Sequence, residues 1–99
     1  MFEEQALELI QETISGLQRS GLIANPVAVE GDTVLLGAGS PLDSLAFVTF
    51  IADLEDRLNR ETARDFSLVL TELHEFNANV PYLSAQAMAR FIARLTDGN

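Results

Sequence analysis

Apolar residues recur every three or four positions in four separate stretches of the chain, and this spacing predicts four amphipathic helices. The predicted helices run over about residues 2–19, 44–59, 66–76 and 84–95. Ser84 stands at the start of the last stretch, where its hydroxyl is expected to cap the helix. The apolar positions are, in chain order, Ala6, Leu7, Ile10, Ile14 and Leu17; Phe47, Phe50, Ile51, Leu54 and Leu58; Phe66, Leu70, Leu73 and Phe76; and Ala87, Met88, Phe91, Ile92 and Leu95. We therefore expect an all-α four-helix bundle.

Glycine and proline punctuate residues 21–43, which argues against a helix there. Two apolar runs around Gly31 are compatible with a hairpin from Val27 to Leu36. An isolated hairpin is only marginally stable in water, however. We therefore favour a long ordered loop between the first and second helices, with its valines and leucines packed across the bundle.

The length and charge of the chain restrict its class. Its 99 residues fit one domain, residues 1–99, with a single modest core. It has no cysteine, which excludes disulfides, thiolate metal sites and a cysteine nucleophile. Its formal net charge is −9, and all six basic residues are arginines. Such a charge repels nucleic acids and anionic membranes, so we expect protein partners with basic patches.

The sequence carries no sign of export or of a membrane span. It starts with Met-Phe-Glu-Glu-Gln, which is acidic where a secretory signal is basic. Its longest apolar run is far shorter than the roughly 20 residues that a membrane-spanning helix needs. We therefore expect a cytoplasmic protein that does not insert into membranes.

The second predicted helix has more apolar surface than one core contact uses. At 3.6 residues per turn its core positions fall on one side, while a second group falls largely on another. One interpretation is a docking surface for partners. The alternatives are that the bundle itself covers both faces of the helix, or that Leu45 and Val48 pack under the long loop. The second group comprises Leu45, Val48 and Ala52, alongside Thr49, Glu55 and Asp56.

Ser44 stands between the glycine- and proline-bearing loop and this helix. It, or Asp43 before it, can act as an ordinary N-cap. The same position also suits a phosphate ester, because free N–H groups and the helix dipole favour negative charge there.

The sequence does not favour an enzyme that catalyses a reaction by itself. His74 is the only histidine, and no Gly-x-Ser-x-Gly motif surrounds Ser44. A domain of this size also leaves little room for a catalytic pocket with an oxyanion hole. One histidine among scattered carboxylates does not form a metal site, so we expect neither catalytic residues nor a bound metal.

The string Gly-Ser-Pro-Leu-Asp-Ser-Leu-Ala-Phe-Val, residues 39–48, resembles the phosphopantetheine attachment motif of acyl and peptidyl carrier proteins. Its Asp-Ser-Leu core is Asp43, Ser44 and Leu45. A helix and a long loop precede the motif, as in that family. Apolar residues follow at the family's spacing: Leu45, Val48, Ile51, Leu54 and Leu58. The layout of most of the chain resembles a carrier, and the specific motif covers about residues 39–58.

This resemblance implies an acyl-carrier-like four-helix bundle with a short third helix, acting as a monomeric carrier rather than an enzyme. A phosphopantetheinyl transferase would move a 4′-phosphopantetheine arm from coenzyme A onto Ser44, flanked by Asp43 and Leu45. Acyl groups would then be carried as thioesters on the thiol of the arm. Loading ligases and acyltransferase or synthase enzymes with basic patches would recognise the second helix. The residues for this recognition would be Leu45, Val48, Thr49, Ala52, Glu55 and Asp56.

The chain departs from the common fatty-acid carriers at several positions. Those carriers place acids where Ala46 and Thr49 stand here, and a small residue where Phe47 stands. The segment from Asn59 to Pro81 is also longer. These differences indicate a specialised carrier for a fatty-acid, polyketide or lipid pathway, in which Phe47 narrows any acyl pocket.

Three alternatives remain at this point. The chain could be an aminoacyl or peptidyl carrier loaded by an adenylating ligase. It could be a carrier-like module that is never modified and only binds other proteins, although the intact Asp43-Ser44-Leu45 motif argues against this. A small hydrolase that uses Ser44 is the third, and it lacks a base.

Overall fold

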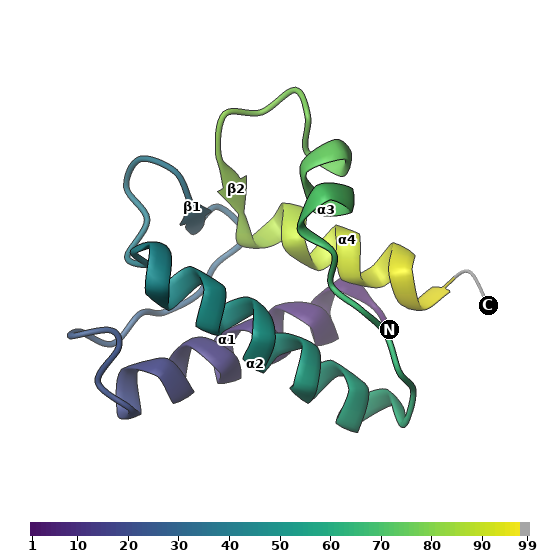
Figure 1. The fold of residues 1–99 in the computed structure, drawn as a ribbon, viewed down its shortest axis with the longest axis horizontal. Coiled ribbons are helices and arrows are strands. Elements are labelled where there is room, and N and C mark those ends of the chain that lie inside the picture. The colour runs from purple at the N-terminus through teal and green to yellow at the C-terminus, as the bar shows by residue number, and fades with distance from the viewer. Residues whose placement is uncertain (98–99) are drawn as a thin grey trace.

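A computed structural model describes residues 1–97 of the chain as a mostly helical fold (Figure 1). Its Cα radius of gyration is 12.5 Å, close to the ~13 Å of a compact domain of this length. The elements are helix α1 (Glu3–Arg19), strand β1 (Val34–Leu36), helix α2 (Ser44–Thr62), helix α3 (Leu70–Phe76), strand β2 (Leu83–Ser84) and helix α4 (Ala85–Asp97). No helix within this described range is long and apolar enough to cross a membrane.

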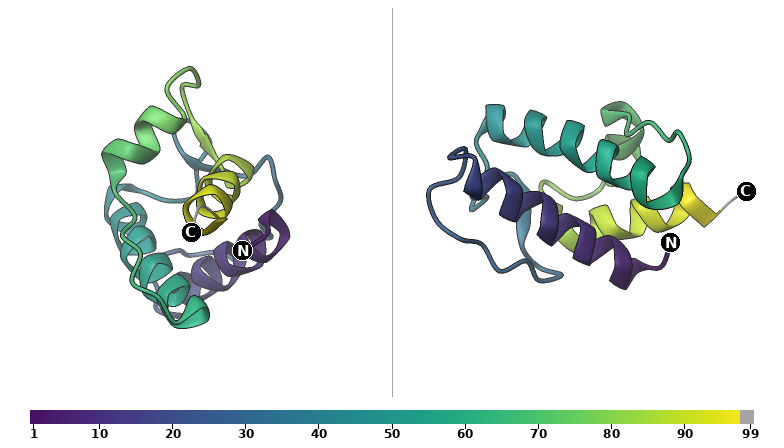
Figure 2. Two further views of the ribbon diagram at one scale, coloured as in Figure 1. Left: turned by 90° about the vertical axis from the view of Figure 1, so that its right-hand side faces the viewer. Right: turned by 90° about the horizontal axis from the view of Figure 1, so that it is seen from below.

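Helix α1 lies at the centre of the helix packing. It packs against both α2 and α4, and α3 packs against α4 (Figures 1 and 2). Helices α1 and α2 lie side by side and run in opposite directions, as the view from below shows (Figure 2). The three longer helices therefore enclose the core, and the short α3 lies above α4.

The core stripe predicted for α2 is confirmed. All five predicted positions are buried, and Ala46 joins them. The stripe predicted for α1 needs one correction, because Leu9 is buried where we expected Leu7, which is only half-buried. The buried stripe of α1 also includes Thr13, whose hydroxyl donates to the carbonyl of Leu9 at 2.7 Å. A threonine can occupy the core there because this hydrogen bond satisfies its only polar side-chain group.

The segment between α1 and α2 is not the strand-free loop that we favoured. Strand β1 pairs antiparallel with β2, which immediately precedes α4. The alternative hairpin from Val27 to Leu36 is wrong as well, because the partner of β1 lies far along the chain. The all-α prediction therefore omits one short pairing, which joins the first inter-helix segment to the start of α4.

The same segment is held to α1 by one side chain. Gln11 donates from Nε2 to the carbonyl of Val27 at 2.9 Å and accepts at Oε1 from the N–H of Val29 at 2.7 Å. Val27 and Val29 are partly buried against the core, and Ile23, Leu35 and Leu42 are fully part of it. The predicted packing of apolar loop residues across the helices is confirmed for these residues, whereas Leu36 is 47% exposed.

Helix α3 is shorter than predicted, since it begins at Leu70 rather than near residue 66. The residues before it follow α2 as a strap, which we define as residues 63–69. Asn59 binds both backbone groups of Phe66, accepting from its N–H at 2.7 Å and donating to its carbonyl at 3.0 Å. The N–H and the carbonyl of Phe66 are therefore hydrogen-bonded to a side chain and not to the backbone of a helix. Of the four apolar positions predicted for α3, only Leu73 is buried inside the helix.

The ends of the other helices differ slightly from the prediction. Helix α2 continues to Thr62 and ends at Ala63, which adopts the left-handed conformation (φ 54°). Helix α4 begins after Ser84, whose hydroxyl accepts from the N–H of Ala87 at 3.1 Å. The predicted cap at Ser84 is therefore confirmed. Met88, Phe91 and Ile92 of α4 are buried as expected, whereas Ala87 and Leu95 are only partly buried.

The packing of α2 leads to a stability prediction with a matched control on the same helix. Leu54→Ala should lower the free energy of unfolding by roughly 2–5 kcal/mol, because it opens a cavity in the core. Leu45→Ala should change it little, because the Leu45 side chain is 66% exposed. Urea unfolding of both variants measures the difference. Equal losses would show that α2 does not have this rotation about its axis.

Candidate functional site at the start of helix α2

The sequence left open which of two neighbouring residues, Asp43 or Ser44, caps α2. Asp43 is the N-cap of α2, and its Oδ1 accepts from the N–H of Ala46 at 2.7 Å. Ser44 is the first residue of the helix, and its side chain is exposed. Within residues 1–97 its hydroxyl makes no hydrogen bond, so Ser44 is not the cap. The structure thus places a free hydroxyl beside the N–H groups of the first helical turn.

The chain that leads into this turn is fixed by a serine. The hydroxyl of Ser40 donates to the carbonyl of Leu35 at 2.7 Å and accepts from the N–H of Leu42 at 3.0 Å. Leu35 belongs to β1, and both leucines are buried. The approach to Asp43 is therefore tied to β1 and to the core, which holds the start of α2 in a defined place.

The second apolar group of α2 faces solvent. Leu45 is 66% exposed and Val48 is 59% exposed. Ala52 is exposed too, and Thr49 is half-buried with its hydroxyl donating to the carbonyl of Leu45 at 2.9 Å. The interpretation in which these residues pack under the long loop is therefore wrong for Leu45 and Val48. Two large apolar side chains lie uncovered within one turn of Ser44.

The acids predicted to join this surface are already engaged within the chain. Oε2 of Glu55 accepts from the N–H of Leu68 at 2.8 Å, which fastens the strap to α2. Asp56 forms an exposed ion pair with Arg60 at 2.7 Å. Sequence spacing did not reveal the first contact, because Leu68 reaches Glu55 only through the fold of the strap. Glu55 therefore also holds the strap in place, and Arg60 lies beside the charge of Asp56.

A cavity of about 280 Å³ opens beside Phe47, one helical turn after Ser44. Its walls are mainly apolar, and His74 and Asn77 supply polar groups. The amide of Asn77 also donates to the carbonyl of Tyr82 at 2.7 Å, which ties α3 to the chain before β2. The cavity is lined by Leu36, Phe47, Leu70, Leu73, His74, Asn77, Pro81, Tyr82 and Leu83.

Sequence reasoning missed the part of this cavity that comes from the strands and their flanks, which is four of its nine lining residues. One signal was present in Gly37, which has a positive φ of 117° and follows β1 directly. A Cβ on Gly37 would lie 3.0 Å from the Cβ of Tyr82, so glycine is needed where Tyr82 packs. His74 is exposed and lies at the cavity wall.

No group of His, Asp or Glu side chains among residues 1–97 is arranged to hold a metal ion. Comparison with protein-family models, curated proteins and solved structures found no match for this chain. Any functional assignment therefore has to come from the residues and geometry of the chain itself.

The capping geometry predicts different losses of stability for alanine substitutions at Asp43 and Ser44. Asp43→Ala should lower the free energy of unfolding by about 1 kcal/mol, because it removes the acceptor for the N–H of Ala46. Ser44→Ala should cost clearly less, because the Ser44 hydroxyl caps nothing. Thermal or urea unfolding of the two variants tests this order, and a larger loss for Ser44→Ala would contradict the assignment of the cap.

Proposed function

We propose that this protein is an acyl carrier protein that holds acyl groups on a phosphopantetheine arm attached to Ser44. One observation carries the proposal: the Asp-Ser-Leu motif opens α2 with the serine hydroxyl exposed and free of hydrogen bonds. Asp43 performs the capping, so Ser44 has no structural task of its own at this position.

The surroundings of Ser44 fit a phosphate ester. Its hydroxyl lies at the positive end of the dipole of a 19-residue helix. Backbone N–H groups of the first turn are available there to an anion. In the attachment reaction the Ser44 oxygen loses its proton and forms the phosphate ester, while the pyrophosphate bond of coenzyme A breaks and adenosine 3′,5′-bisphosphate leaves. When bound, the arm supplies a thiol that carries the acyl group as a thioester.

The exposed face of α2 supports recognition by partner enzymes. Leu45 and Val48 offer an apolar centre next to the modified residue. Apolar centres surrounded by polar groups are the usual composition of protein interfaces. A phosphopantetheinyl transferase, a loading ligase and acyltransferase or synthase enzymes would dock here in turn.

The packing of α2 favours a specialised carrier over a general fatty-acid carrier. Ala46, which stands where those carriers have an acid, is only 1% exposed and lies in the core. A carboxylate at this position would be buried without a partner, so this protein cannot present the usual acidic pattern. Partner enzymes that read that pattern would bind it poorly.

The first experiment is intact-protein mass spectrometry after incubation with coenzyme A and a promiscuous phosphopantetheinyl transferase. We expect the mass of one phosphopantetheine to be added to the wild type and to Ser67→Ala, which removes another exposed serine. Ser44→Ala should stay unmodified while keeping its helical circular dichroism. No addition to the wild type with several transferases would reject the proposal and favour an unmodified protein-binding module.

The cavity beside Phe47 fits the distal end of a short cargo. Its volume of about 280 Å³ is slightly below the ~300–1,000 Å³ of pockets that hold drug-sized ligands. Loading with a hexanoyl group, compared with an acetyl group, should shift the amide NMR signals of Leu73 and Leu83. The signal of Glu4 in the first turn of α1 should not move. Equal spectra for both cargoes would show that the acyl chain stays outside the cavity.

A further inference from the structure

The strap runs back along α2 and is tied to it at two points (Figures 1 and 2). Asn59 holds both backbone groups of Phe66. Glu55 lies one turn earlier in α2 and accepts from the N–H of Leu68 at 2.8 Å. The point of contact on α2 therefore moves towards Ser44 as the strap advances towards α3. Of the two ties, the one at Glu55 is nearer to α3.

Helix α3 starts without a side-chain cap. It has seven residues, and an isolated helix shorter than about 12 residues is only marginally stable in water. Its N-cap is Val69, whose side chain makes no capping hydrogen bond. Leu68 directly precedes Val69 and is only 8% exposed. The hydrogen bond to Glu55 therefore fixes the backbone immediately before α3 begins.

The far end of α3 is held by other contacts. The ring of Phe76 packs edge-on against Phe91 of α4, with 5.6 Å between the ring centroids. The amide of Asn77 donates to the carbonyl of Tyr82. Neither contact involves α2. Within residues 1–97, the hydrogen bonds that connect the approach to α3 with α2 are those of the strap.

The separation of α2 and α3 sets the width of the cavity beside Phe47, whose volume is about 280 Å³. Helix α3 supplies four of the residues that line it, at spacings of three and four that place them on one helix face. They are Leu70, Leu73, His74 and Asn77. The first of them follows Leu68 by only two residues. A displacement of Leu68 would therefore move this wall of the cavity.

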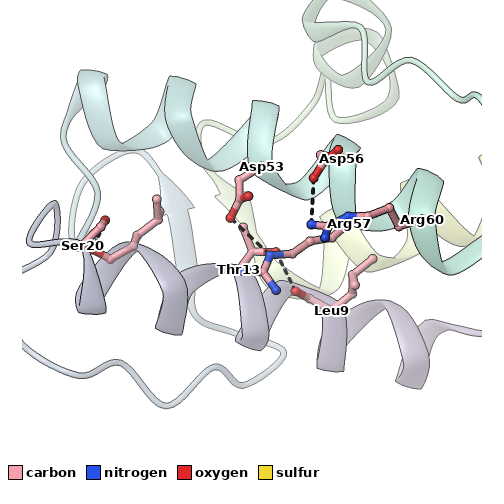
Figure 3. A network of polar contacts seen from close by, with 8 residues as sticks. Leu9, Thr13, Ser20, Asp53, Asp56, Arg57 and Arg60 are labelled. Carbon is pink, nitrogen blue, oxygen red and sulfur yellow. Dashed lines mark hydrogen bonds and ion pairs between the residues drawn. The ribbon is translucent and has the colours of Figure 1, made fainter.

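Two neighbouring acids of α2 make different contacts. The hydrogen bond from the N–H of Leu68 to Glu55 has an ionised acceptor, and such bonds are stronger than those between neutral groups. Asp56 is exposed and pairs with Arg60 of the same helix, so it does not contact the strap (Figure 3). Asp56 is therefore a matched control for Glu55.

We propose that Glu55 is a positioning residue for the cargo cavity. Its carboxylate holds the strap, and through it the start of α3, at the separation from Phe47 that leaves room for an acyl chain. This inference rests on the carrier function proposed above, and it gives Glu55 a role in holding cargo besides the recognition of partner enzymes.

The first test is amide hydrogen exchange, followed by NMR, in the chain without an arm. The N–H of Leu73 donates to the carbonyl of Val69 within α3 and so reports on the opening of this helix. Glu55→Ala should speed its exchange roughly tenfold, the effect of losing one hydrogen bond to a charged group. Asp56→Ala should leave the rate unchanged. Equal rates in Glu55→Ala and the wild type would overturn the inference whether or not the chain is a carrier.

The second test uses the loaded carrier and the amide signal of Leu83, which belongs to β2 and lies outside both the strap and α3. Glu55→Ala should lose more than half of the shift that separates hexanoyl from acetyl cargo in the wild type. Glu55→Gln should keep most of this shift, because the glutamine oxygen still accepts from the N–H of Leu68 although the charge is gone. Asp56→Ala should keep all of it.

The outcomes separate the inference from the proposed function. A full cargo-dependent shift in Glu55→Ala would overturn the inference while leaving the carrier function intact. Equal losses in Glu55→Gln and Glu55→Ala would also overturn it, because the charge and not the tie to the strap would then matter. A wild-type chain that accepts no arm would reject the proposed function, and the inference with it. Circular dichroism of each variant verifies that the fold is retained.

Discussion

The burial of one face of α2 against the core is the constraint on which the rest of the structure depends. Phe50, Leu54 and Leu58 are completely buried, and they fix the rotation of the helix about its own axis. With that rotation set, Leu45 and Val48 must face solvent, and Ala46 must face the core. Apolar side chains of this size contribute most of the folding free energy of a small domain, so this orientation is strongly specified. The exposed hydroxyl of Ser44 is a consequence of the packing of residues one to four turns away.

The sequence was sufficient where a strong local period existed. The five core positions of α2 follow from their spacing alone, and the cap at Ser84 follows from a serine at the start of an amphipathic stretch. It was insufficient where contacts join distant segments. Strand β1 has only three residues, and its partner strand directly precedes α4, so no local sequence pattern predicts the pairing. The late start of α3 depends likewise on the side chain of Asn59, which reaches forward to Phe66.

The candidate site shows the same division. Its motif and the second apolar group of α2 could be read from the sequence, because both are local. The cavity beside Phe47 could not, because its walls come from α2, α3 and both strands, which are far apart in the sequence. The hydrogen bond from the N–H of Leu68 in the strap to Glu55 could not be predicted from the sequence either. In physical terms, the face of α2 beside Ser44 presents the exposed side chains of Leu45 and Val48, with the ion pair of Asp56 and Arg60 further along the helix.

The most direct test of the central claim is the state of Ser44 in protein purified from its own source organism. The chain has no lysine, and the arginines flanking Ser44 are Arg19 and Arg57, so trypsin releases Ser44 within residues 20–57. Tandem mass spectrometry of this peptide should find phosphopantetheine, free or acylated, on Ser44 and on no other hydroxyl. A peptide that is unmodified in all preparations, or modified at a different residue, would contradict the account.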